Sequence, residues 1–122
     1  ACSQRSISNW VSKCMTTDIG YYFNMDQIKA DPWNSPEKMW QHSPLKYANM
    51  AKTPTLFIQS DEDYRCWMGD AIQMFSALKY FGVEARMCLF HGENHELSRS
   101  GKPKHRIRRM TEMMEWFEKY LK

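Results

Sequence analysis

The feature that most constrains the fold is an apolar run, an amphipathic stretch and a second apolar run, which follow one another between residues 54 and 90. The run at 54–58 is nearly continuous in apolar residues, which is typical of a parallel strand buried on both faces. From 67 to 81 apolar residues recur at helical spacing, at Ala71, Met74, Phe75 and Leu78. Gly82 stands where a helix C-cap glycine belongs, and residues 83–90 predict the next strand. This order predicts a βαβ unit with a right-handed crossover.

The flanking segments extend this α/β pattern. Residues 2–7 predict a strand, whereas turn signals break residues 8–50 into short helices and loops, one of them a helix near 45–50. Pro103 suits the first turn of a last helix. The predicted core face of that helix is an apolar stripe at Ile107, Met110, Met114, Phe117 and Leu121. We expect its charged pairs on the solvated side, Arg108 with Glu112 and Glu115 with Lys119.

The length and composition predict one compact domain over residues 1–122. A hydrophobic content of 43% supplies a core and argues against disorder, and no apolar run is long enough to cross a bilayer. The four cysteines form no Cys-x-x-Cys pair, so we expect free thiols and a cytoplasmic location. Because the chain starts at Ala1 rather than Met, we expect a fragment, a processed chain or a trimmed one.

The charge is mild and predicts neither a nucleic-acid partner nor a membrane partner. The formal net charge is +3, and the basic residues at 102–109 alternate with the apolar stripe instead of with stacking aromatic residues. A solvated helix face is therefore favoured over a phosphate-binding surface.

Two charged loops follow the predicted strands. Asp61, Glu62 and Asp63 come after the first strand, and His91 and His95 come after the second. Sites in open parallel sheets form at the carboxyl ends of the strands, where we expect these loops to meet. A histidine can accept a proton from a hydroxyl, and a carboxylate bonded to its other nitrogen fixes the tautomer.

Simpler interpretations of these residues remain open from the pattern alone. The acidic run is also favourable as a charge cluster at the start of the helix near Trp67, and a loop histidine is commonly a surface residue. His91 and His95 are four apart, but Gly92 and the strand end argue against the regular helix that a zinc pair of this spacing requires. We expect no metal and no cofactor.

Taken together, four segments resemble the C-terminal part of the catalytic domain of the prolyl oligopeptidase family, in its acylaminoacyl-peptidase and dipeptidyl-peptidase-like branch. These segments are residues 54–58, 61–66, 77–84 and 92–103, and the stretch 4–10 is also similar to that branch. The resemblance implies the C-terminal portion of an α/β-hydrolase fold, a three-layer αβα arrangement around a small, mostly parallel sheet. It also implies a serine peptidase acting on short peptides or acylaminoacyl peptides, without a cofactor.

The resemblance assigns roles to two residues. Asp63, which precedes Tyr64 and Arg65, matches the triad aspartate in preference to Asp61, and His95 matches the triad histidine in preference to His91. The chain departs from the family where Gln59-Ser60 replaces a common His-Gly and where Trp67 replaces a common Pro. In the resembled family this irregular segment packs beside the active site, so we expect one or two of its aromatic residues to line a substrate pocket and most of them to pack in the core, the candidates being Trp10, Tyr21, Tyr22, Phe23, Trp33 and Trp40.

The nucleophile is missing from the pattern. The 122 residues contain no Gly-x-Ser-x-Gly elbow, and Ser6, Ser8, Ser98 and Cys66 lack the glycine-flanked turn that exposes a nucleophile. We therefore expect the chain alone to be inactive. The alternative function is a non-catalytic interaction module that pairs through an open sheet edge, with a second copy or with a missing N-terminal half.

Overall fold

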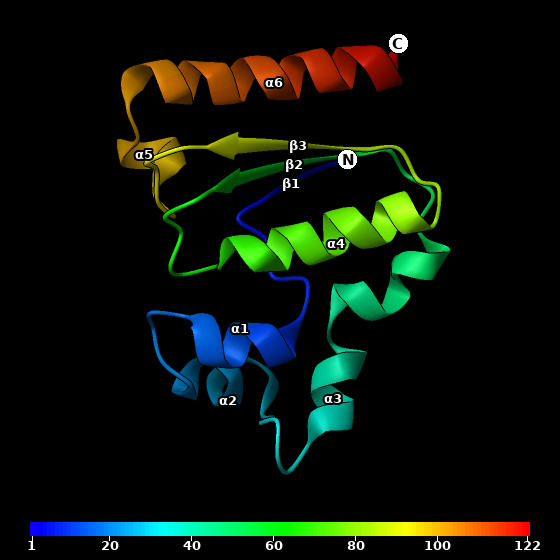
Figure 1. The fold of residues 1–122 in the computed structure, drawn as a ribbon, viewed down its shortest axis with the longest axis vertical. Helices are drawn as coiled ribbons and strands as arrows, with labels where there is room; N and C mark the ends of the chain where they lie inside the picture. The colour runs from blue at the N-terminus through cyan, green and yellow to red at the C-terminus, as the bar shows by residue number, and fades with distance from the viewer.

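A computed structural model describes all residues, 1–122, and has the layered α/β architecture that the sequence predicts (Figure 1). The elements are β1 (Cys2–Gln4), α1 (Trp10–Thr16), α2 (Tyr22–Ile28), α3 (Pro36–Gln41), the 3₁₀-helix η1 (Pro44–Met50), β2 (Thr55–Ser60), α4 (Met68–Tyr80), β3 (Ala85–Phe90), α5 (Leu97–Ser100) and α6 (Pro103–Leu121).

The three strands form one parallel sheet in the order β1-β2-β3. Helix α6 lies on one face of this sheet and α4 on the other, and the short helices α1, α2 and α3 lie beyond α4 (Figure 1). Five of the six residues of β2 are buried, because both faces of the central strand are covered. The predicted βαβ pattern is confirmed, with Gly82 in the left-handed conformation (φ +75°) that a glycine adopts without strain.

Each face of the sheet has its own apolar cluster. On the α6 face, Leu56, Ile58, Phe90, Leu97 and Trp116 pack together. On the α4 face, the cluster consists of Phe57, Leu78, Val83 and Ala85. Alternate residues of β2 thus point to opposite faces, which fixes the register of the strand and the point where it ends.

The predicted core face of α6 is wrong at four of its five positions, and only Phe117 packs against the sheet as predicted. Ile107 is 68% exposed and Leu121 is 78% exposed, and Met110 and Met114 are also exposed. The helix instead buries Trp116 and packs the neighbouring side chains Met113, Phe117 and Tyr120 against the sheet. These positions are also three and four apart, so the sequence carries two apolar stripes, and the more aromatic one covers the sheet.

The predicted charge arrangement on α6 is also wrong. Glu112 pairs with Arg108 as expected, but its carboxylate is buried rather than solvated, because Arg86 of β3 reaches it at 2.8 Å. Lys119 pairs with Glu84 at 2.6 Å and not with Glu115.

The segment between β1 and β2 is more regular than its turn signals suggest. It contains three short α-helices and η1, and η1 occupies the position predicted for a helix near 45–50. Asp70 of α4 attaches α1 to the sheet layers: its Oδ1 accepts hydrogen bonds from the Asn9 backbone N–H (3.2 Å) and the Ser12 hydroxyl (3.0 Å).

Candidate active site

The loop after β2 holds Asp63 in a buried position. Its carboxylate Oδ1 accepts hydrogen bonds from the backbone N–H groups of Arg65 (3.0 Å) and Cys66 (2.8 Å). The amide nitrogen of Gln59, the fifth residue of β2, lies 3.3 Å from Oδ2. The side chain of Asp63 has no solvent exposure, so protein donors replace the water that an ionised carboxylate requires.

The loop after β3 is attached to the first loop by backbone hydrogen bonds. The N–H of Asp61 donates to the carbonyl of Phe90 (3.2 Å), and the N–H of Glu62 donates to the carbonyl of Glu93 (3.0 Å). The guanidinium of Arg5, a residue in the left-handed region (φ 53°), donates to the carbonyl of His95 (3.0 Å). The two loops therefore form one connected edge at the carboxyl ends of the strands.

A buried glutamate attaches the histidine loop to α6. Glu93 accepts hydrogen bonds from the backbone N–H of Lys102 (3.0 Å) and from Nδ1 of His105 (2.6 Å). Burial raises the pKa of Glu93, but the hydrogen bond from His105 and the other donors outweigh that effect, so the pKa is lowered overall. The ionised form of Glu93 is thus the one that holds this loop against the start of α6.

These two loops bring His95 and Asp63 together. Nδ1 of His95 lies 2.9 Å from Oδ2 and 3.2 Å from Oδ1 of Asp63. Because an ionised carboxylate only accepts hydrogen bonds, Nδ1 carries the proton and Nε2 keeps its lone pair in the neutral imidazole. Nε2 has no hydrogen-bond partner within the chain, and 23% of the side chain is exposed. A base with one nitrogen oriented and the other free is suited to accept a proton from a hydroxyl.

The rival residues form a second, different pair. Nδ1 of His91 lies 2.5 Å from Oδ2 of Asp61, and the N–H of Gly92 donates to Oδ1 of Asp61 (2.8 Å). The hydrogen bond from His91 is the main reason that the pKa of Asp61 is lowered. His91 is 95% exposed at the side chain, so water and not the protein surrounds this imidazole. The pair has the right atoms but lacks the buried setting that restricts His95.

A hollow of 360 Å³ adjoins His95. Apolar and cationic side chains share its wall, which consists of Gln4, Arg5, Ile7, Lys13, Ile19, Phe23, Arg65, Cys66 and His95. Of the aromatic residues proposed to line a substrate pocket, only Phe23 does so here, and Tyr21, Tyr22 and Trp33 are exposed elsewhere.

The alternative nucleophiles have other environments. The hydroxyl of Ser8 is buried and donates to the carbonyl of Asp70, and that of Ser6 is buried without a partner. Burial, the largest effect, raises the pKa of the Cys66 thiol to about 11, which opposes formation of a thiolate. Ser98 lies at the groove along α6.

Sequence reasoning named Asp63 and His95, which the structure places in contact, but it did not name the residues that hold them. Gln59 bonds to Asp63, Arg5 bonds to the carbonyl of His95, and Glu93, within the histidine loop, attaches that loop to the start of α6. The replacement of the common His-Gly by Gln59-Ser60 was a signal for the first of these. Arg5 carried no such signal, because its contact depends on a left-handed turn at the end of β1.

Two further observations concern the whole chain. All four cysteines are free thiols, with Cys14 and Cys66 buried. None of the helices has the length and apolar character needed to span a membrane.

Comparisons with known proteins agree with this geometry. Residues 1–122 match the description of the prolyl oligopeptidase family. The uncharacterized peptidase YuxL of Bacillus subtilis is 43% identical over 121 residues, which is 99% of this chain and 18% of that protein. The acylamino-acid-releasing enzyme of Arabidopsis thaliana is 29% identical over 129 residues, covering 100% of this chain and 16% of the enzyme.

A solved structure shows the same arrangement. The acylaminoacyl peptidase of Pyrococcus horikoshii superposes with a TM-score of 0.91 and 36% sequence identity, over 96% of this chain and 19% of that one. The chain thus spans about a fifth of the length of these relatives. Its fold is that of the C-terminal part of an α/β-hydrolase domain, and the chain belongs to the prolyl oligopeptidase family.

Proposed function

We propose that this chain supplies two of the three triad residues of a serine peptidase that cleaves short peptides or acylaminoacyl peptides, with Asp63 as the carboxylate that orients the histidine and His95 as the general base and then acid. The observation that carries the proposal is the 2.9 Å contact between Nδ1 of His95 and the buried carboxylate of Asp63. The relatives, which include an acylaminoacyl peptidase, support the substrate class.

In this mechanism the nucleophile is a serine that these 122 residues do not supply. Nε2 of His95 takes the serine proton as the hydroxyl oxygen attacks the substrate carbonyl, and then gives that proton to the departing amine. A water molecule repeats the sequence on the acyl-enzyme, which releases the acid product and restores the serine. Asp63 accepts the hydrogen bond from the Nδ1–H of His95 throughout and stabilises the imidazolium.

Several further statements belong to the same proposal. Residues 1–122 form one partial peptidase domain, and the isolated chain does not hydrolyse esters or peptides, because two triad members add little without the third. The unpaired cysteines support a cytoplasmic location. In the isolated chain, turnover of a p-nitrophenyl ester that depends on His95 would contradict the proposed inactivity.

A chimera tests the catalytic assignment. In it, this chain replaces the aligned segment of the Bacillus subtilis relative, and hydrolysis of an N-acylaminoacyl p-nitroanilide is measured. We expect His95→Ala to lower kcat by at least about a thousand-fold. The matched control His91→Ala, four residues away, is expected to retain activity within about threefold. Equal losses in the two variants would remove the assignment.

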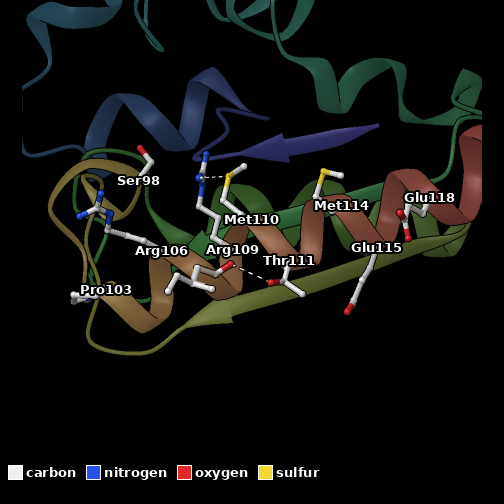
Figure 2. Close-up of a pocket in the computed structure, with 10 residues that line it drawn as sticks. Ser98, Pro103, Arg106, Arg109, Met110, Thr111, Met114, Glu115 and Glu118 are labelled. Carbon is white, nitrogen blue, oxygen red and sulfur yellow. Dashed lines mark hydrogen bonds between the residues drawn. The ribbon is translucent and has the colours of Figure 1, made fainter.

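A second function, an interaction surface, is favoured by one specific observation. The apolar stripe of α6 that was predicted as its core face is largely exposed and lines a groove, where Met110 and Met114 stand side by side along the helix (Figure 2). Strand β1 pairs only with β2, so its other edge is unpaired. We propose that this groove and edge receive the remainder of the peptidase domain, the part that the longer relatives have in addition.

Light scattering after size-exclusion chromatography distinguishes this occupant from a second copy of the chain. We expect the isolated chain to self-associate weakly, in proportion to its concentration, and Met114→Glu to abolish the association. We expect the chimera, in which the rest of the domain is present, to show no association through this surface. Association of the chimera that Met114→Glu abolishes would favour the homo-oligomer instead.

A further inference from the structure

Lys13 is an unusual feature of α1, because its side chain is buried without an ion pair, and the carboxylates of Asp70 and Asp18 act on it only from a longer distance. The residue is 1% exposed, although lysine is rarely this buried unless it is paired. Its ammonium group forms no ion pair, and its partners are the Thr17 hydroxyl (2.8 Å), the carbonyl of Arg65 and the ring of Phe23 (5.2 Å to the centroid). Every one of these partners is neutral.

The carbonyl of Arg65 is the point at which α1 contacts the loop after β2, which contains Asp63. It accepts hydrogen bonds from Lys13 and from the Thr17 hydroxyl (2.9 Å). One residue earlier, the carbonyl of Tyr64 accepts a hydrogen bond from the N–H of Asp18 (2.8 Å). The guanidinium of Arg65 completes the contact by donating to the carboxylate of Asp18 (2.6 Å). Residues 13–18 thus form hydrogen bonds to the carbonyls of residues 64 and 65 and to the side chain of residue 65.

The turn at residues 64–66 also forms hydrogen bonds to the side chain of Asp63. The N–H groups of Arg65 and Cys66 both donate to Oδ1 of Asp63. A shift of the Arg65 carbonyl would tilt the peptide that links Arg65 to Cys66 and so move one of these donors. The bonds from α1 and the bonds to Asp63 therefore involve the same short turn. Lys13 binds the carbonyl of Arg65, whereas Asp63 binds the N–H groups of the turn.

Burial of an ammonium group costs free energy, and this cost needs an explanation. Burial is the main reason that the pKa of Lys13 is lowered. An apolar residue of similar length would fill the space without that cost, since replacing buried charges by packed apolar groups is often neutral or stabilising. A space-filling role alone therefore does not account for a lysine here.

We propose that Lys13 is a positioning residue for Asp63, the proposed triad aspartate. By fixing the carbonyl of Arg65, Lys13 holds the turn that orients Asp63, and Asp63 in turn favours the Nδ1–H tautomer of His95. The inference rests on the proposed function only in taking Asp63 as the triad aspartate. It gives α1, an element that supplies no triad residue, a part in the site.

Nuclear magnetic resonance of the 122-residue chain tests the proposal without any need for activity. The ratio of the Nδ1–H to the Nε2–H tautomer of His95 is read from the nitrogen chemical shifts at about pH 9, where an ordinary imidazole is neutral. We expect the Nδ1–H tautomer to dominate in the unmodified chain. Lys13→Met is expected to lower the ratio roughly fivefold, the effect of about one hydrogen bond. Both tautomers are neutral, so loss of the lysine charge by itself changes the ratio little.

Two further variants keep the test decisive. Thr17→Val removes the other side-chain donor to the Arg65 carbonyl without changing any charge, and it is expected to lower the ratio in the same direction. Lys79→Met, at an exposed position of α4, is the matched control and is expected to leave the ratio unchanged. If Lys13→Met does not fold, Thr17→Val decides.

The outcomes separate this inference from the proposed function. An unchanged ratio in the folded variants at 13 and 17 overturns the role of Lys13 and leaves the Asp63–His95 pair intact. An unmodified chain in which the Nε2–H tautomer dominates overturns the pair itself, and the role of Lys13 with it.

Discussion

At the scale of single residues, the site depends on how many donors surround one carboxylate. Asp63 is in contact with two backbone N–H groups, the Gln59 amide and Nδ1 of His95. Gln59 replaces a residue that the family commonly has as histidine, yet its amide also donates to the carbonyl of Cys66 (2.8 Å) and so links the strand end to the turn. The departure from the family pattern therefore retains a donor beside the acid.

Replacing each of the two candidate triad aspartates, Asp63 and Asp61, by asparagine separates their roles. In the chimera, Asp63→Asn is expected to lower kcat by roughly ten-thousand-fold, because an amide at this position favours the wrong histidine tautomer. Asp61→Asn, two residues away in the same loop, is expected to stay within about threefold, since its partner His91 is exposed. Steady-state kinetics on the same p-nitroanilide give both values, and a larger loss for Asp61→Asn would reverse the assignment.

The ion pair between Arg65 and Asp18, which attaches the loop after β2 to the segment that follows α1, predicts that the free energy of unfolding depends on pH. The hydrogen bond from Arg65 is the main reason that the pKa of Asp18 lies below its ordinary 3.8. A carboxylate whose pKa is lowered by folding stabilises the folded state above its unfolded-state pKa, and this contribution disappears as the pH falls through the folded-state pKa. Because Asp18 is partly exposed, solvent screening limits the contribution to about 0.5 kcal/mol.

We therefore expect Asp18→Asn to lower the free energy of unfolding by about 0.5 kcal/mol at pH 7 and by progressively less below about pH 4. Urea unfolding at several pH values measures the difference between the two chains. A difference that grows on acidification would contradict the direction of the shift.

At the scale of elements, α6 has two apolar stripes with different tasks. Trp116 is buried in the cluster that also contains Leu56 and Phe90, whereas Met114 is 56% exposed in the groove. The stripe facing the sheet stabilises this chain, and the exposed stripe is available for the interaction surface proposed above.

Two alanine substitutions, one in each apolar stripe of α6, measure how much each stripe stabilises the chain. Trp116→Ala is expected to lower the free energy of unfolding by roughly 3–5 kcal/mol, because it removes a large buried ring and leaves a cavity. Met114→Ala, two residues away on the same helix, is expected to change it by less than about 0.5 kcal/mol. Urea unfolding of both variants provides the comparison. Equal effects would mean that the predicted stripe, and not the observed one, is the core face.

The elements also show what sequence reasoning can reach. The βαβ unit was predictable because β2 and β3 are short apolar runs and α4 has a single helical spacing that ends at Gly82. The core face of α6 was not predictable, because periodicity alone does not choose between two stripes on one helix. Burial of Glu112 was equally out of reach, since it depends on Arg86, a residue of another element.

For the site, the same reasoning reached the two residues that follow strands but not their supports. Asp63 and His95 were found from their place after β2 and β3 together with the family resemblance. Lys13, Arg5 and Glu93 act through contacts between distant segments, and local sequence carries no record of such contacts.

At the scale of the whole molecule, the chain is a three-stranded sheet whose candidate site lies at the carboxyl ends of β2 and β3. The carboxyl ends of β2 and β3 meet as one hydrogen-bonded rim, and α1, α5 and α6 support that rim from three directions (Figure 1). The outer sides of β1 and β3 are both unpaired. This arrangement fits the proposed function, in which the chain presents His95 and Asp63 to a serine from elsewhere.

The most direct test of this account is whether Asp63 and His95 act as a unit. In the chimera, kcat is measured for Asp63→Asn, for His95→Ala and for the double variant. Residues that act as a unit are strongly non-additive, so the double variant is expected to match His95→Ala within about threefold. A double variant whose loss equals the product of the two single losses would show that the two residues act independently, and would contradict the account.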